Sequence, residues 1–252
     1  MDLFQKIGPI KTKVLTAVMN NLFIVSFVKD FLYHIRLSFL AVMASIAIIF
    51  LWPTTMIENS VHWHIFGGVV DSNIFFHLFH FPHITFACAT SMLAIYRGTH
   101  NLLLAIVASC IFPVMFCTLS DVILPYAGGE VLGVDMLLHI CITCSPVALL
   151  SFLSVGLLSG YLLIKYSQTS RIYHLTLVAH FFHELFSGIA SLAYIAGFGL
   201  ADWNNHLLSV LILILFAVIL PCMLSDFFMP LLIQKLLGKK HGNKIQCCLG
   251  KD

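Results

Sequence analysis

Residues 101–125 read NLLLAIVASCIFPVMFCTLSDVILP, an apolar run in which Asp121 is the single charged residue. A helix needs about 20 predominantly apolar residues to cross the hydrocarbon core of a bilayer. The run therefore predicts a membrane-spanning helix that carries a carboxylate inside the apolar layer. An ionisable group in a span costs about 2.5–3.5 kcal/mol at the bilayer centre, so it needs a partner or a function.

The whole chain has the composition of a membrane protein. Hydrophobic residues make up 60% of it, charged residues 10%, and the mean hydropathy is +0.99. Soluble domains are about 45–50% apolar and about 25% charged, so this chain lacks the polar groups to cover its surface. The net charge of +2 argues against a nucleic-acid partner. The eight Cys are scattered and are mostly within apolar runs, which excludes a secreted disulfide framework.

Five further apolar runs accompany residues 101–125. They lie at about 37–53, 74–96, 136–164, 173–198 and 206–234. Residues 136–164 are too few for two passes, so we count them as one tilted span. The predicted fold class is an all-α integral membrane protein with six transmembrane helices. Residues 1–29 carry apolar side chains at helical spacing and predict an amphipathic interfacial helix, with a short spanning or re-entrant helix as the alternative.

The loop charges predict an orientation. Lys and Arg occur before the first span, in the loops after the second and fourth, and after the sixth, whereas the charged residues of the other three loops are all acidic. The positive-inside rule then places both termini in the cytoplasm, and we expect a plasma or inner membrane. Residues 235–252 are a predicted cytoplasmic tail.

Three polar motifs occur twice in the same order. Asp30-x3-His34 recurs as Asp135-x3-His139, His77-x2-His80 as His180-x2-His183, and Ser120-Asp121-x3-Pro125 as Ser225-Asp226-x3-Pro230. From 30 to 135 and from 120 to 225 the offset is 105 residues, and from 77 to 180 it is 103. The predicted repeats are residues 30–125 and 135–234. Three spans per repeat invert the second copy, an architecture typical of secondary transporters and shared by channels.

The repeated residues have the side chains and the spacing of metal ligands. Asp-x3-His and His-x2-His each place two side chains on one helical face, and two His with a neighbouring carboxylate suit Zn, Fe or Mn. The candidate metal ligands are His77, His80, Asp121, His139, Asp135, His180, His183, Asp226, His34 and Asp30. Secondary candidates are Glu184, His83, Ser120 and Ser225.

The two prolines predict helix kinks. Proline cannot donate to the carbonyl four residues back, which is that of Asp121 for Pro125 and that of Asp226 for Pro230. A carbonyl freed at membrane depth persists only where it lines a cavity or meets a partner. We therefore expect the carboxylate, the carbonyl and the preceding Ser hydroxyl to face one cavity.

Topology distributes the candidates over the two halves of the bilayer. We expect His77, His80 and Asp121 toward the outer side, with Asp135 and His139 starting the fourth span there. The counterparts expected toward the inner side are His180, His183 and Asp226, with Asp30 and His34 starting the first span. This predicts one metal site in each half, or one merged site near the midplane. His83 has Phe186 as its counterpart and Glu184 has Phe81, so the sites would differ in affinity, or Glu184 would carry a proton.

The favoured function is a transporter of a divalent transition metal (Zn, Fe(II) or Mn), with proton coupling because the ligands must lose protons. One alternative is an intramembrane metalloenzyme, either a lipid hydrolase or a di-iron oxygenase. The other is a di-haem b-type electron carrier, and haem is the less favoured cofactor. The expected partners are membrane lipid and the metal ion, and a homo-oligomer is left open. We interpret the cysteines as buried thiols, with Cys141-x2-Cys144 as alternative copper ligands.

Overall fold

The computed structural model describes residues 28, 31–33, 35–52, 54–57, 60–65, 68–166, 171–199, 203–229 and 232–233. Outside the described residues lie Asp30, His34, Pro230, the predicted tail, all but one residue of the predicted interfacial segment, and the side chain of Asp226. The chain divides into two units, Met1–Arg36 and Leu37–Asp252. The second unit contains the candidate site.

In the described part of the chain, five helical segments are long and apolar enough to cross a membrane. They are Phe31–Leu51, Ser72–Thr99 (α2), Leu102–Val131, Pro146–Tyr166 (α6) and Val178–Phe198. The last belongs to the longer helix Arg171–Phe198 (α7). A sixth apolar helix, Leu207–Met223 (α8), is shorter and continues into a π-helix, Leu224–Phe228 (η4). The protein is therefore a mostly helical membrane protein, and the count of six spans stays a prediction.

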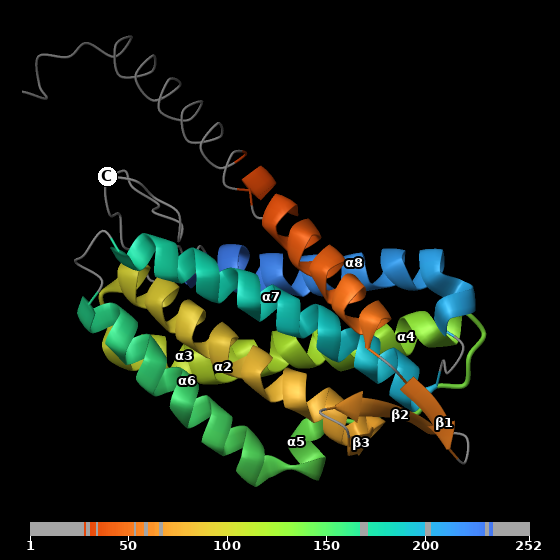
Figure 1. Cartoon of the computed structure of the whole chain (residues 1–252). Helices are drawn as coiled ribbons and strands as arrows, with labels where there is room; N and C mark the ends of the chain where they lie inside the picture. The colour runs from red at the N-terminus through yellow and green to blue at the C-terminus, as the bar shows by residue number, and fades with distance from the viewer. Residues whose placement is uncertain are drawn as a thin grey trace, which may run out of the picture. The chain divides into compact units, whose positions relative to one another are not determined.

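Helix α2 lies between α6 and α7 and also packs against α3, Leu102–Thr118 (Figure 1). Two glycines one turn apart let α6 approach α2 closely. A Cβ atom on Gly156 would lie 2.9 Å from the carbonyl oxygen of Thr85, and one on Gly160 would lie 3.2 Å from that of Ala89. Thr85 Oγ1 also donates to the Phe152 carbonyl at 3.1 Å. Small residues at this spacing are typical of packing between membrane helices.

Helices α2 and α7 run antiparallel. The start of α2 meets the end of α7, where a Cβ atom on Gly197 would lie 2.4 Å from Cβ of Ser72. Helix α7 also contacts the helix that ends at Leu51, because Ser45 Oγ donates to the Leu185 carbonyl at 2.9 Å. Helix α7 is thus held on two sides, and its polar residues are buried between neighbouring helices.

A small antiparallel sheet precedes α2, although the sequence predicted only helices. Its strands are Thr54–Ile57 (β1), Ser60–Ile65 (β2) and Gly68–Asp71 (β3), in the order β1-β2-β3. The register pairs Trp63 with Thr54 and with Val70. The Trp63 ring is fully buried and stacks on Phe75 of α2 at 4.2 Å. Strands rich in β-branched residues and joined by two-residue connections were the sequence signal for this hairpin pair.

The segment with the Ser-Asp motif has the same local structure in both copies. Helix α3 is followed by a π-helix, Leu119–Ile123 (η2), and then by Leu124–Val131 (α4). Helices α3 and α8 are both 17 residues long, η2 and η4 are both 5, and their starts (102 and 207, 119 and 224) are 105 residues apart. The repetition in sequence is accompanied by repetition of an uncommon helix form. The inverted relation of the complete halves stays a prediction.

The fourth span begins later than predicted. Residues 134–140 are not helical, a short helix covers Cys141–Cys144 (α5), and α6 starts at Pro146. Gly133 ends the preceding helix with φ of 79°, and a residue before proline is disfavoured in a helix, so Ser145 separates α5 from α6. The expectation that Asp135 and His139 share a helical face is therefore wrong.

Candidate metal centre

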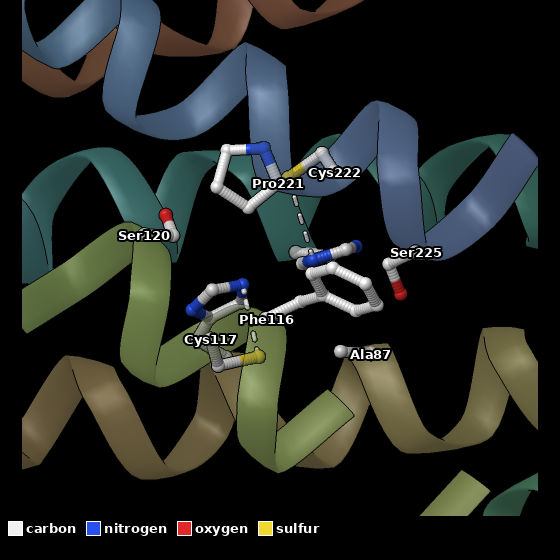
Figure 2. A pocket seen from close by; sticks show the side chains of 9 residues that line it. Ala87, Phe116, Cys117, Ser120, Pro221, Cys222 and Ser225 are labelled. Carbon is white, nitrogen blue, oxygen red and sulfur yellow. Dashed lines mark hydrogen bonds between the residues drawn. The ribbon is translucent and has the colours of Figure 1, made fainter. Parts of the chain in front are cut away.

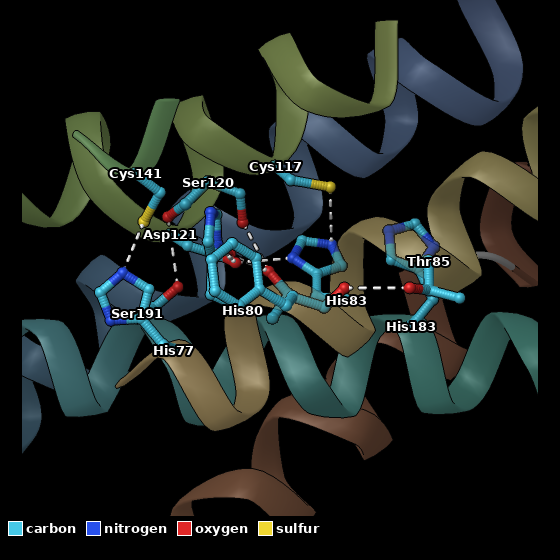
Figure 3. A network of polar contacts seen from close by, with 12 residues as sticks. His77, His80, His83, Thr85, Cys117, Ser120, Asp121, Cys141, His183 and Ser191 are labelled. Carbon is cyan, nitrogen blue, oxygen red and sulfur yellow. Dashed lines mark hydrogen bonds and ion pairs between the residues drawn. The ribbon is translucent and has the colours of Figure 1, made fainter. Parts of the chain in front are cut away.

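Asp121 is fully buried and joins two histidines of α2. Its Oδ2 atom accepts hydrogen bonds from Nδ1 of His80 at 2.8 Å and from Nδ1 of His83 at 2.6 Å, and its Oδ1 accepts from Ser187 Oγ at 2.7 Å (Figure 3). An ionised carboxylate can only accept, so both histidines carry a proton on Nδ1. In the neutral rings Nε2 then has the lone pair that binds metals. Carboxylates orient metal-binding histidines in this way in many proteins.

Asp121 lies within a π-helix, which changes the backbone hydrogen bonds around it. The Leu124 N–H donates to the Leu119 carbonyl, five residues back. In that register Pro125 leaves the Ser120 carbonyl without its backbone donor, and Ser191 Oγ of α7 donates to it at 3.2 Å. The sequence predicted that Pro125 would free the carbonyl of Asp121. Because a π turn spans one residue more than an α turn, the freed carbonyl is that of Ser120. Single π turns within α-helices are frequent at functional sites.

The two predicted repeats meet at a pair of stacked imidazoles. The rings of His83 on α2 and His183 on α7 have centroids 4.7 Å apart. Cys117 Sγ lies 3.4 Å from His83 Nε2, and Cys222 Sγ lies 3.7 Å from His183 Nε2. Figure 2 shows Cys117 and Cys222 at a small cavity that Ser120 also lines. Ligand atoms of His83, His183 and Cys222 all lie within 4.8 Å of one another.

Cys117 and Cys222 were interpreted from the sequence as inert buried thiols. They are buried, but each contacts a histidine of the candidate centre. From 117 to 222 the offset is 105 residues, the same as for the Ser-Asp motifs, so the repeated motif is Cys-x-Leu-Ser-Asp-x3-Pro. That repetition was the signal available in the sequence. His83, a secondary candidate in the sequence, contacts both Asp121 and Cys117.

A second cluster lies toward the Ser72 end of α2. His77 Nε2 is 3.4 Å from Cys141 Sγ, and the ligand atoms of His77, His139 and Cys141 all lie within 4.8 Å of one another. His77 and His139 are half-buried and Cys141 is buried. Burial lowers the pKa of His139 below its ordinary value, and the nearby His80 lowers it further. The His139 imidazole is therefore neutral at pH 7 and has a lone pair for a metal.

A third group lies farther along α7. His180 Nε2 is 3.3 Å from Glu184 Oε1, which also accepts a hydrogen bond from Ser38 Oγ. Glu184 is 1% exposed, and within the described residues its Oε2 has no hydrogen-bond partner. The ring centroids of His180 and His183 are 5.7 Å apart, so this group adjoins the stacked rings of His83 and His183, the central pair.

The structure separates the predicted ligands into these groups. His77 and His139 lie with Cys141, His80 and His83 lie with Asp121, and His183 faces His83. Ser225 Oγ is 3.5 Å from Ser91 Oγ, and Ser225 lines the cavity. Asp135 is exposed and joins none of the groups found among the described residues, because its segment is not helical. Pro125 is buried in the first turn of α4.

The donor set fits a metal that prefers nitrogen and sulfur. The three clusters of possible ligands offer imidazole nitrogen, thiol sulfur and one carboxylate. His80 Nε2 is buried and, within the described residues, has no hydrogen-bond partner. Buried polar atoms are nearly always satisfied, so such an atom points to a ligand. Comparisons of the chain with protein-family models, curated proteins and solved structures find no match.

Proposed function

We propose that the protein is a membrane transporter of a divalent transition metal ion, bound between α2, α7 and α8 by His83, His183 and Cys222. The observation that carries the proposal is the close grouping of these three ligands, within 4.8 Å of one another. Asp121 would orient His83 by accepting its Nδ1 hydrogen, which leaves Nε2 for the ion. A binding site for a transported ion needs such ligands deep in the membrane.

The depth of the ligands supports transport. His83 lies eleven residues after Ser72 and His183 lies fifteen residues before Phe198. At 1.5 Å per residue these are about 16 Å and about 22 Å from the helix ends, and the hydrocarbon core is about 30 Å thick. The central pair thus lies near mid-membrane if the helices cross it. Substrate sites of transporters with inverted repeats lie near the midplane, where the repeats meet.

The thiol ligand favours zinc among the three predicted metals, and the distances between ligand atoms are compatible with it. Nitrogen and sulfur ligands of a tetrahedral zinc, with bonds of about 2.0–2.1 Å and about 2.3 Å, lie about 3.5 Å apart. The Nε2–Sγ distances are 3.4 Å for His83 with Cys117 and 3.7 Å for His183 with Cys222. Thiolate ligands suit zinc better than manganese, which prefers oxygen. Iron(II) is the second choice.

The inverted repeat and the orientation belong to this proposal. Two inverted halves would allow the central site to open in turn to each side of the membrane. With both termini in the cytoplasm by the positive-inside rule, the end of α2 at Ser72 would face outward. Binding would release protons from the ligands, and proton exchange would follow.

The two alternatives use the same residues. A metalloenzyme would activate water at the ion, and would show turnover of a lipid substrate instead of net ion movement. A di-haem carrier would hold each haem iron between two histidines whose ring nitrogens point at it, but the His83 and His183 rings stack face to face with their centroids 4.7 Å apart. The stacked rings leave no space for a porphyrin between them, so the di-haem alternative is disfavoured.

Uptake of zinc into liposomes tests the proposal. Purified protein is reconstituted into liposomes that contain a zinc-sensitive dye. The rate of zinc uptake is compared for wild type, His183→Ala and the control His206→Ala, which alters an exposed histidine. We expect uptake by wild type and the control, and a loss of at least about tenfold in His183→Ala, because a ligand is removed. Equal rates in all three proteins, or no uptake of Zn, Fe(II) or Mn by wild type, would overturn the proposal.

A further inference from the structure

A second set of ligands lies apart from the central pair, at the end of α2 that begins at Ser72. His77 is on the second turn of α2, whereas His139 and Cys141 come from the segment that joins α4 to α6. Their ligand atoms lie within 4.8 Å of one another, and His77 Nε2 is 3.4 Å from Cys141 Sγ. None of the three belongs to the central group of His83, His183 and Cys222. We call the three residues the mouth cluster.

The protonation state of His77 suits a metal ligand. His77 Nδ1 is 2.7 Å from the Asn73 carbonyl oxygen, which can only accept a hydrogen bond. The hydrogen is therefore on Nδ1, and in the neutral ring the Nε2 lone pair faces the Cys141 thiol. A backbone carbonyl that fixes the tautomer is a common feature of metal-binding histidines.

The non-helical segment fixes the position of His139. Its backbone N–H donates to the Tyr194 hydroxyl at 3.1 Å, and that hydroxyl donates to the Leu137 carbonyl at 2.8 Å. Its ring stacks on Phe198 at 5.0 Å and lies edge-on to His77 at 5.3 Å. A helix over residues 135–139 would lack this arrangement. The departure from helix thus places His139 and Cys141 against His77.

We propose that the mouth cluster is a second transition-metal site that binds a zinc-like ion through two imidazoles and one thiolate, with water as the fourth ligand. Zinc sites with three protein ligands and an exchangeable position are typical where the ion must react or leave. The half-buried His77 and His139 give the ion access from solvent, whereas the central histidine His83 is 1% exposed.

The role of the mouth cluster in transport rests on the proposed function. His80 lies one turn deeper on α2 than His77 and belongs, with His83 and Asp121, to the next group of ligands. Its Nε2 is buried and has no hydrogen-bond partner within the described residues. An ion that leaves the mouth cluster could bind this nitrogen before it reaches His83. The mouth cluster would then capture the ion and supply the central site.

Zinc stoichiometry tests the second site. Metal-stripped protein is loaded with Zn²⁺ alone, and bound zinc per chain is measured for wild type, Cys141→Ala, Cys222→Ala and the control Cys110→Ala, a half-buried cysteine outside every ligand group found in the described residues. We expect two equivalents in wild type and in the control, and one equivalent in each of the other variants. Loading with Co²⁺ should give thiolate-to-cobalt absorption that falls by about half in Cys141→Ala, since thiolates bind in both sites.

Two further results make the test decisive. His77→Ala should lose the same equivalent as Cys141→Ala while its thermal unfolding stays near that of wild type, which excludes misfolding as the cause. Retention of both equivalents and of the full cobalt absorption in Cys141→Ala would overturn the second site. Loss of one equivalent in Cys141→Ala, together with no uptake of Zn, Fe(II) or Mn by wild-type liposomes, would keep the second site and refute transport. Uptake by wild type, together with an unchanged stoichiometry in Cys141→Ala, would keep transport and refute the second site.

Discussion

The imidazole rings of His83 and His183 stack with their centroids 4.7 Å apart and an angle of 26° between their planes. One ring comes from α2 and the other from α7, which belong to different predicted repeats. The contact therefore lies where the two halves meet. In the proposed transporter, a movement of one predicted repeat relative to the other would separate these two rings and weaken binding of an ion between them.

Replacing the stacked histidines should act on one binding event. We expect His83→Ala and His183→Ala each to weaken zinc binding at the centre by more than about tenfold. The double variant should be little worse than either single one, because groups that act as a unit are not additive. Isothermal titration with zinc measures this. Fully additive losses would show that the two rings do not share an ion.

Asp121→Asn tests the orienting role of the carboxylate. The amide keeps the size of the side chain but accepts on one oxygen only, so it cannot hold both Nδ1 hydrogens and the Ser187 hydroxyl. We expect zinc affinity to fall by about 10–100-fold with the protein still folded. The matched control is Asp135→Asn, which alters an exposed carboxylate. An equal effect in both variants would contradict this role.

The sulfur ligands should decide which metal is preferred. Cys222→Ser replaces a soft ligand by a hard one and should weaken zinc binding much more than manganese binding. Competition between the two ions, followed by elemental analysis, measures the change in preference. Cys117→Ser should show a smaller change in the same direction, because Cys117 contacts His83 but is outside the group of three ligands. An unchanged preference in Cys222→Ser would show that its sulfur is not a ligand.

Metal binding should depend on pH with a definite sign. A protonated imidazole has no lone pair, so binding requires the neutral form and is lost as the pH falls through the pKa of the ligands. Protons compete with the metal ion for the imidazole nitrogens, so we expect binding to weaken from about pH 7 to about pH 5. Zinc affinity measured across this range should fall by more than tenfold, since two histidines bind the ion. A flat profile would exclude histidine ligands.

Gly156→Leu should weaken the packing of α6 on α2. The Cβ atom would lie 2.8 Å from Cβ of Cys88 and 2.9 Å from the Thr85 carbonyl oxygen, so the helices must separate. We expect a loss of about 1–3 kcal/mol in the free energy of unfolding, as for other overpacked sites. Val155→Leu adds bulk to a residue that is 54% exposed and is the control. Thermal unfolding in detergent compares the two, and equal midpoints would argue against the close approach.

The sequence indicated the class of the protein, its repeated motifs and several residues that the structure brings together. Composition sufficed for the class, because a chain with 60% hydrophobic and 10% charged residues must be solvated partly by lipid. Period and spacing sufficed to place His77 and His80 on one helix, since residues three apart share a face. The motif around Asp121 pointed to an altered helix, and the structure has a π turn there.

The tertiary structure decided which of these residues meet. Spacing gives the face of a helix but not the helix that packs against it, so the contact of His83 with His183 and the two thiols beside them could not be derived from it. Asp135 is excluded from the site because residues 134–140 make their backbone contacts with neighbouring helices instead of forming a helix. The sequence by itself determined the solvent and the chemistry available, and packing determined which side chains share a site.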